Sequence, residues 1–423
     1  MPKKLNLVDL FAGCGGLSLG LENAGFNPIF VDELNNDALE SYLINREKKH
    51  PLLRDSRFHI NNVKDLVTDK NRIPDLIKHF SEEYGIDVNK GDIDLLVGGP
   101  PCQGYSNIGH RRSYSVDKKQ LPSNHLYQDM AWLISQLKPK IFLFENVRGL
   151  LSARWESTSE KGGIWKDVVR TFSDLKNYTI NHSLVYAKNY GVPQNRPRVL
   201  LVGVRNDIDI SVWSSDPSNV ANNFLPKESG NPPDLEDLLS DLVDPNFIYG
   251  GETNSYLVDP QTPIQKKLRK LPIGNKVLKA GDTLTDQQYS NHSETVRNKF
   301  KAMISNNGVI PDEFKTKKFA QRLLPKKWLS NGPTITATSL PDDYVHFSQA
   351  RTLTVREWAR LQGFPDWYQF AGKRTTGGIR RAGNPRDGIF DRELPKYTQI
   401  GNAVPVALAE AIGNHFKKIL GAK

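Results

Sequence analysis

Cysteine is scarce in this chain: only Cys14 and Cys102 occur among 423 residues. Two cysteines cannot build a disulfide scaffold, and such low usage is typical of the reducing cytoplasm, where we expect the protein to reside. The nine histidines show neither paired Cys/His spacing nor an H-E-x-x-H pattern. We therefore predict that the protein has no metal site.

Long hydrophobic runs are also missing. No stretch approaches the roughly 18 apolar residues that a membrane-spanning helix needs. The N-terminal sequence MPKKLNLVDLF opens directly into a strand-like run and lacks the apolar segment and cleavage site of a signal peptide. We expect no association with a membrane.

Acidic residues are outnumbered, with 47 Asp and Glu against 57 Lys and Arg, which gives a formal net charge of +10. Such an excess favours a polyanionic partner. The alternative is a lysine-rich surface that only aids solubility, because the excess is modest for a chain of this length.

The first half of the chain alternates short apolar runs with helix-length segments. This pattern predicts a mostly parallel α/β sheet covered on both faces, which binds ligands beyond the carboxyl ends of its strands. The predicted strands are Leu5–Leu10, Ile29–Asp32, Asp94–Val97, Ile141–Phe144, Ser183–Ala187 and Val199–Val204.

After Arg205 the sequence changes character. Residues 206–346 are rich in Asn, Pro, Ser and Lys, and their weak periodicity predicts a separate, less regular domain. Regular patterns return at Arg351–Leu361, which predicts a helix, and at Ala403–Ile419, an apolar helix of the kind that packs against a sheet.

A glycine-rich segment, VDLFAGCGGLSLGLENAG, occupies residues 8–25. It predicts a strand, a tight turn and a helix whose N-terminal N–H groups face a ligand. Glu33 follows about 20 positions later, where an acidic residue can hold a ribose. The spacing differs from the dinucleotide pattern G-x-G-x-x-G, which favours a smaller adenosine-type cofactor. A plain strand–helix connection is the alternative.

A stiff turn follows the next predicted strand, in the sequence DIDLLVGGPPCQGYS at residues 92–106. Gly98–Pro101 would carry Cys102 to the edge of the sheet where substrates bind. A reactive thiolate needs nearby positive charge, which the His-Arg-Arg sequence at 110–112 could supply. The alternative is that Cys102 is a small buried hydrophobic residue.

Two further polar positions adjoin predicted strands. Glu145 ends the apolar run of IFLFENVRGL, where a carboxylate would project to the same edge or cap the next helix. In VPQNRPRVLLVG, Arg196 and Arg198 point to one face if the segment is extended. These arginines could instead form surface pairs with nearby carboxylates.

Together these segments resemble the DNA (cytosine-5) methyltransferase family over most of the chain. The family's motifs occur in order at Asp9–Gly16, Pro100–Gln103, Glu145–Val147, Gln194–Arg198, Arg351–Pro365 and Gln399–Pro405. The resemblance implies a Rossmann-like S-adenosylmethionine-dependent methyltransferase sheet with a second, target-recognition domain. The implied domains are a catalytic and cofactor-binding domain at 1–205, target recognition at 206–396, and a C-terminal helix at 397–423 that returns to the catalytic domain.

The resemblance also implies which residues bind S-adenosylmethionine: Phe11, Gly13, Gly15, Gly16, Glu33, Asn62 and Asn402. Phe11 would lie against the adenine, Glu33 would bind the ribose hydroxyls, and Asn402 would contact the methionine end. Where the family often has an Asp for the adenine amino group, this chain has Asn62, whose side-chain oxygen could substitute. Cys14 lies within the cofactor loop and is not expected to be a nucleophile.

By the same resemblance, Cys102 attacks carbon 6 of cytosine and makes carbon 5 electron-rich. Glu145 would protonate or hydrogen-bond ring nitrogen 3. Arg198 would hold the carbonyl oxygen of the base, and Arg196 would help to order the site. The cytosine must be flipped out of a duplex to reach them.

The expected partner is double-stranded DNA, bound by a monomer, with a cognate restriction endonuclease acting on the same site. Residues 206–346 would read base edges in the major groove. The basic stretch Gly372–Arg386 would contact phosphates or be a solvated linker; its cations are Lys373, Arg374, Arg380, Arg381 and Arg386. The alternatives are an RNA cytosine-5 methyltransferase and a non-catalytic DNA-binding regulator, and the complete set of motif residues argues against the latter.

Overall fold

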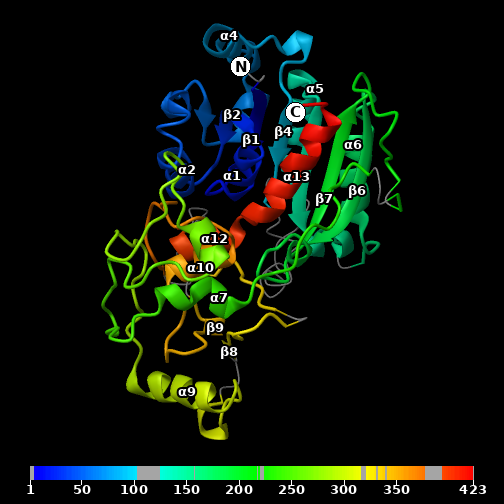
Figure 1. Ribbon diagram of the computed structural model, residues 1–423. Helices are drawn as coiled ribbons and strands as arrows, with labels where there is room; N and C mark the ends of the chain where they lie inside the picture. The colour runs from blue at the N-terminus through cyan, green and yellow to red at the C-terminus, as the bar shows by residue number, and fades with distance from the viewer. Residues whose placement is uncertain are drawn as a thin grey trace. The chain divides into compact units, whose positions relative to one another are not determined.

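The computed structural model describes residues 4–101, 124–156, 158–216, 218–219, 223–315, 321–329, 332–338, 341–376 and 393–422 (Figure 1). The chain divides into two compact units. Unit 1 comprises Met1–Ala187, Pro197–Ser229 and Leu408–Lys423, and unit 2 comprises Lys188–Arg196 and Gly230–Ala407. Residues 206–229 therefore pack with unit 1, beyond the domain boundary expected at residue 205. The functions assigned to the predicted domains remain predictions.

Unit 1 contains a seven-stranded sheet in the order β3-β2-β1-β4-β5-β7-β6, in which β7 alone runs antiparallel to its neighbours. This topology confirms the predicted mostly parallel α/β fold. The strands are β1 (Leu5–Leu10), β2 (Phe26–Asp32), β3 (His59–Ile60), β4 (Leu95–Gly98), β5 (Ile141–Val147), β6 (Tyr178–Tyr186) and β7 (Pro197–Arg205).

Both faces of this sheet are buried. Phe142 and Phe144 on β5 share one hydrophobic core with helices α5 (Leu126–Leu137) and α6 (Gly163–Ser173). Each of the two rings lies within 5.4 Å of the Phe172 ring on α6. Leu143 points to the opposite face because side chains alternate along a strand, and it too is fully buried. Burial on both faces explains why the strands read as continuous apolar runs.

The helices of unit 1 connect the strands and cover them. At the chain's end, α13 packs against the end of α1, since a Cβ built on Gly413 would lie only 2.6 Å from that of Ala24. The helices are α1 (Gly16–Asn23), α2 (Asn36–Ile44), α3 (Val63–Thr68), α4 (Arg72–Tyr84), α5 (Leu126–Leu137), α6 (Gly163–Ser173) and α13 (Val406–Ile419) (Figure 1). Helix α13 starts three residues later than predicted, because Pro405 disfavours helical backbone at the residue before it.

Unit 2 is less regular, as the sequence predicted. Its described elements are α7 (Leu235–Leu239), α8 (Pro263–Leu268), α9 (Glu294–Ser305), α10 (Val355–Leu361), α12 (Lys396–Asn402) and a two-stranded parallel sheet of β8 (Arg322–Leu323) and β9 (Tyr344–Val345). The helix expected at Arg351–Leu361 begins only at Val355. Thr354 caps it in a reciprocal capping box with Glu357, so the preceding residues remain outside the helix.

Buried ion pairs hold unit 2 together around α10. Arg360 contacts the carboxylates of Asp241 and Asp366, and all three side chains are fully buried. Arg351 pairs with Glu357 at 2.7 Å. Although burial disfavours a charged carboxylate, the Arg351 guanidinium overcomes it and lowers the pKa of Glu357 to about 2. The family motif at 351–365 thus supplies much of the internal framework of unit 2.

None of the described helices is long and apolar enough to cross a membrane. The described residues contain no group of three or more His, Cys, Asp or Glu side chains that could hold a metal ion.

Candidate active site

Glu145 and Arg198 form a buried ion pair at the carboxyl end of β5. The Glu145 Oε1 atom lies 2.6 Å from the Arg198 Nε atom, and the side chains are only 11% and 8% exposed. Antiparallel pairing of β5 with β7 places Glu145 opposite Leu200, so Arg198 is its diagonal neighbour on the same face. The structure therefore brings together two of the predicted catalytic residues.

The turn after β4 lies against this pair. Asn146 Nδ2 donates a hydrogen bond of 3.1 Å to the carbonyl oxygen of Pro100. A Cβ built on Gly99 would lie 2.9 Å from Glu145 Oε2, so a larger residue at this position would displace the carboxylate. The turn leading to Cys102 is thus fixed beside Glu145. Cys102 itself, and the His-Arg-Arg sequence at 110–112, lie outside the described residues.

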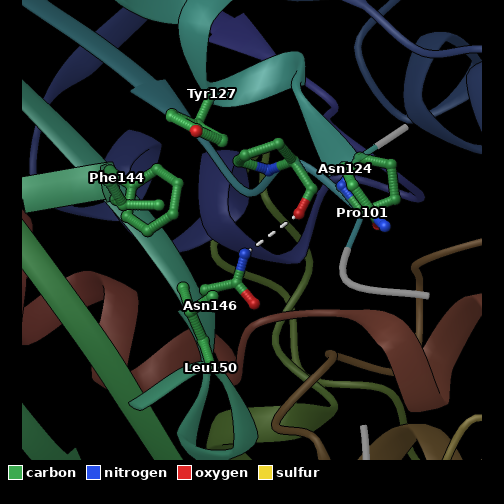
Figure 2. A pocket seen from close by; sticks show the side chains of 8 residues that line it. Pro101, Asn124, Tyr127, Phe144, Asn146 and Leu150 are labelled. Carbon is green, nitrogen blue, oxygen red and sulfur yellow. Dashed lines mark hydrogen bonds between the residues drawn. The ribbon is translucent and has the colours of Figure 1, made fainter. Parts of the chain in front are cut away.

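A small cavity adjoins the same turn, and Figure 2 shows the Asn146–Pro100 hydrogen bond beside it. Pro101 and Asn124, the described residues on either side of segment 102–123, both line this cavity. Its other lining residues are Pro100, Tyr127, Phe144, Asn146, Leu150 and Val168. Pro101 and Asn124 therefore lie close to one another next to the end of β5.

The predicted cofactor loop is bound to the end of β2 through three successive backbone N–H groups. Phe11 donates to Asp32 Oδ2 at 3.2 Å, Ala12 to the Asp32 carbonyl at 2.9 Å, and Gly13 to Glu33 Oε2 at 2.8 Å. Asn35 N–H donates to the other Glu33 oxygen at 2.8 Å. The Glu33 carboxylate is consequently held in one orientation, partly exposed beside the loop.

The backbone of this loop is unusual. Phe11 has φ 56°, a left-handed conformation that a bulky residue adopts only under constraint. Gly13 and Gly15 also have positive φ values, and Gly15 caps the N-terminus of α1, which begins at Gly16. The three predicted glycines therefore form the turn into α1, as the segment's sequence indicated.

Burial changes the acidity of several groups around the loop. It raises the pKa of Asp32 to about 8 and that of Asp9 to about 7. Burial also raises the pKa of Glu33, although the hydrogen bonds from the N–H groups of Asn35 and Gly13 lower it in part. The Cys14 thiol is buried and its pKa is raised far above that of a reactive thiol, which agrees with the expectation that Cys14 is not a nucleophile.

Two other predicted cofactor residues occupy helix ends. Asn62 caps α3, and its side-chain oxygen accepts a hydrogen bond of 3.1 Å from Lys64 N–H. That oxygen was expected to meet an adenine amino group, and a carbonyl oxygen has a second lone pair for it. Asn402 is the last residue of α12 in unit 2 and is exposed. Their roles remain predictions.

Arg196 belongs to unit 2, whereas Arg198 belongs to unit 1. Arg196 donates to the carbonyl oxygens of Ile335, at 2.8 Å, and Gly401. Strand β7 begins at Pro197, so Arg196 lies directly before the strand and Arg198 lies within it.

Three family motifs are hydrogen-bonded to one another within unit 2. Gln194 Nε2 donates to the Leu361 carbonyl at 2.9 Å, and Gln362 Nε2 donates to the Ile400 carbonyl at 2.8 Å. A Cβ on Gly401 would lie 2.1 Å from the Thr336 carbonyl oxygen, so glycine is required there. These motif residues therefore also stabilise the internal structure of unit 2.

Sequence reasoning missed the roles of three residues. Asp32 binds the Phe11 N–H, Asn146 tethers Pro100, and Gly99 makes room for Glu145. A signal was present for each, since Asp32 directly precedes Glu33 and the other two lie within predicted motifs. Their partners, however, are distant in sequence and depend on strand pairing.

The basic stretch Gly372–Arg386 is described only as far as Thr376. Lys373 pairs with Glu393 at 2.7 Å, and Arg374 donates to Ser290 Oγ at 2.7 Å. Arg380, Arg381 and Arg386 lie outside the described residues.

Comparison with known proteins gives a consistent result. The family profile described as "C-5 cytosine-specific DNA methylase" matches residues 5–418. The chain is 30% identical over 423 residues to the type II methyltransferase M.DdeI of Desulfomicrobium norvegicum, a match that covers 96% of this chain and 87% of that protein. It is 30% identical over 420 residues to the type II methyltransferase M.BspRI of Lysinibacillus sphaericus, covering 97% of this chain and 80% of the relative.

A solved structure from E. coli, titled as a candidate DNA modification methyltransferase encoded within a prophage, superposes with a TM-score of 0.65. The match covers 99% of this chain and 100% of that one, at 24% sequence identity. This likeness supports the fold described above.

Proposed function

The chain belongs to the family of C-5 cytosine-specific DNA methylases, and from that premise we propose which of its residues perform the reaction. It is an enzyme that methylates carbon 5 of cytosine at specific sites in DNA. The single observation that carries the residue assignment is the buried Glu145–Arg198 pair, which adjoins the Gly99–Pro100 turn.

The Cys102 thiolate is the proposed nucleophile. Carbon 5 of cytosine is too weak a nucleophile to react unaided with a sulfonium methyl group. A bond from the Cys102 sulfur to carbon 6 converts the ring into an enamine whose carbon 5 is electron-rich. After methyl transfer, loss of the carbon 5 proton to a base expels the thiolate and restores the aromatic ring.

Glu145 supplies the proton or hydrogen bond that neutralises ring nitrogen 3 as the thiolate adds. Arg198 holds one carboxylate oxygen of Glu145 and, with its remaining N–H groups, the carbonyl oxygen of the base. Arg196, bound to Ile335 and Gly401, orders the segment that precedes β7. In this assignment Arg196 positions other groups and does not touch the base.

The residues around the glycine-rich loop fit S-adenosylmethionine. Glu33 uses only one lone pair of each oxygen for backbone N–H groups, so its partly exposed carboxylate can still accept from ribose hydroxyls. Phe11 is partly exposed beside it, where its ring can lie against an adenine. When bound, this cofactor supplies the electrophilic methyl group. Gly13, Gly15 and Gly16 let the backbone approach the cofactor, and Asn62 and Asn402 complete the proposed set.

Duplex DNA is the proposed substrate. A base within a duplex is stacked and paired, so the target cytosine must be flipped out to react. Most of unit 2 would read the target sequence. The relatives named above are type II methyltransferases, which supports a restriction–modification role with a cognate endonuclease. We propose that the enzyme acts as a monomer.

The decisive experiment uses duplex DNA with 5-fluorocytosine at the target, identified first by bisulfite sequencing of DNA from expressing cells. The wild-type enzyme should form a covalent adduct, because fluorine cannot leave as a proton does. Cys102→Ser should form none and lose methyl transfer, while its affinity for S-adenosylmethionine stays close to wild type. An adduct or full activity in the serine variant would overturn the assignment.

A further inference from the structure

Asp32 is not among the residues assigned a role by the motifs, yet it determines how the cofactor loop is held. Its Oδ2 atom accepts the Phe11 N–H, and its carbonyl accepts the next N–H along the chain. Phe11 is one of five described non-glycine residues with positive φ. A buried acceptor thus lies where the backbone adopts a conformation unfavourable for a bulky side chain.

Burying the Asp32 carboxyl group costs free energy. The residue is 2% exposed, and its Oδ1 atom has no hydrogen-bond partner among the described residues. A buried polar atom without a partner destabilises a fold. A residue selected only for packing at the end of β2 would not carry it, so the group's use lies in the contact that Oδ2 makes.

We propose that Asp32 is a positioning residue for cofactor binding: by accepting the Phe11 N–H it fixes the left-handed conformation that presents the Phe11 ring to the adenine of S-adenosylmethionine. This inference rests on the proposed contact between Phe11 and adenine. Without the acceptor, Phe11 relaxes to an ordinary backbone conformation and its ring leaves the adenine position.

The chemistry of Asp32 indicates which replacement should preserve this function. Burial raises the pKa of Asp32 to about 8, and the nearby charges of Glu33, Asp9 and Asp65 act in the same direction. The hydrogen bond from the Phe11 N–H lowers the pKa but does not offset these effects. Near neutral pH the group is therefore mostly a neutral acid whose Oδ2 accepts as a carbonyl oxygen does. An asparagine oxygen provides the same acceptor in the same place, whereas alanine and serine side chains are too short.

The test measures the dissociation constant of S-adenosylmethionine by calorimetry, and kcat at saturating cofactor, for wild type, Asp32→Ala, Asp32→Asn and Phe11→Ala. Asp32→Ala should weaken cofactor affinity about tenfold, the equivalent of one lost hydrogen bond, and leave kcat within about twofold. Asp32→Asn should bind the cofactor as wild type does. Asp32→Ser replaces the alanine variant if that one fails to fold.

The double variant Asp32→Ala/Phe11→Ala separates this inference from the proposed function. If Asp32 acts through Phe11, the double variant binds no more weakly than Phe11→Ala alone. Additive losses, or full affinity in Asp32→Ala or in the serine variant that replaces it, overturn the inference while Phe11 keeps its role. Unchanged affinity in Phe11→Ala instead overturns the proposed adenine contact itself.

Asp94 offers a matched control for a purely structural effect. It is 1% exposed, and its carboxylate accepts Asn6 N–H at 2.8 Å and pairs with Lys140 at 2.7 Å just before β4 begins, at the opposite end of the parallel strands. Asp94→Ala should lower the melting temperature without changing cofactor affinity. Equal losses of affinity in the Asp94 and Asp32 variants would show that Asp32 only stabilises the sheet.

Discussion

The carboxylate of Glu145 lies 2.6 Å from the Arg198 guanidinium because β5 and β7 pair in antiparallel register. The strand that runs against the others thereby returns an arginine from a later motif to the carboxyl end of β5. A buried carboxylate and the arginine that pairs with it depend on each other, because removing one partner leaves the other charge uncompensated.

Glu145→Gln should slow the chemical step by roughly 10²–10⁴-fold, the usual contribution of a general acid–base group. The amide keeps the shape and a hydrogen bond but has no proton to transfer. Single-turnover methyl transfer should be measured beside DNA affinity, which should change little. A collapse of affinity with normal single-turnover chemistry would show that Glu145 only binds or supports.

Gly99→Ala should reduce activity strongly, because the new Cβ would lie 2.9 Å from Glu145 Oε2 and displace the carboxylate. Gly163→Ala is the matched control, since no atom lies within 4 Å of a Cβ built there. We expect kcat to fall by at least tenfold in the first variant and to stay within about twofold in the second, since about 1.4 kcal/mol of lost transition-state stabilisation suffices for a tenfold effect. Equal activities would mean that the carboxylate moves without consequence.

Local pattern was enough to predict the strand Leu5–Leu10, whose bounds are those of β1. A continuous apolar run flanked by a glycine-rich turn has few other interpretations. Pattern was insufficient where a tertiary partner decides the conformation. Arg351 has helical spacing with the residues after it, but its ion pair with Glu357 and the cap at Thr354 exclude it from α10.

The site shows the same division. Glu145 and Arg198 could each be placed at a strand end from sequence, but their contact depends on β7 being antiparallel, which no local signal specifies. The hydrogen bond from Phe11 to Asp32 depends on the pairing of β1 with β2. The residues that could take part in the reaction were therefore predictable from the sequence, whereas the residues that position them were not.

Stability should fall as pH rises from about 4 to 7, in part because of Asp9. Burial raises the pKa of Asp9 from 3.8 to about 7, so the folded state binds its proton more tightly than the unfolded state does. Stability from this group is complete below pH 4 and is lost as pH rises through 7. Asp9→Asn keeps the acceptor for Ser18 and should flatten the decline in melting temperature between pH 5 and 8.

Glu313→Gln removes one negative charge from an exposed side chain and controls for net charge alone. Its pH profile should parallel that of wild type. If Asp9→Asn also parallels wild type, Asp9 is ionised in the folded protein throughout this range.

Arg360→Met should destabilise unit 2 by about 3–5 kcal/mol, because it removes the guanidinium shared by two buried carboxylates. Asp366 then loses its ion pair, and Asp241 keeps only its pair with Arg269. Lys373→Met breaks a pair whose lysine is 60% exposed, and should cost about 0–1 kcal/mol. Chemical denaturation of the two variants measures both values. Similar small losses would mean that the Arg360 cluster is not a structural centre of unit 2.

Target specificity should move with a graft that starts at residue 230, and a graft that starts at residue 206 should fold poorly. Residues 206–229 belong to unit 1, where Asn223 accepts a 2.8 Å hydrogen bond from Asn181 on β6 and its carbonyl contacts His415 on α13 at 2.6 Å. The Trp213 ring also packs against His415. Replacing this segment by a relative's removes these contacts from the catalytic unit.

Two chimeras should therefore be compared, with residues 230–346 or 206–346 taken from a relative of different specificity. Both retain the host motif at 351–365 with its internal Arg351–Glu357 and Arg360–Asp366 ion pairs. The donor must supply a carboxylate in place of Asp241, the other partner of Arg360. We expect the shorter graft to melt closer to wild type, and bisulfite sequencing to show methylation at the donor's target. A folded shorter chimera that methylates only the original target would place recognition outside residues 230–346.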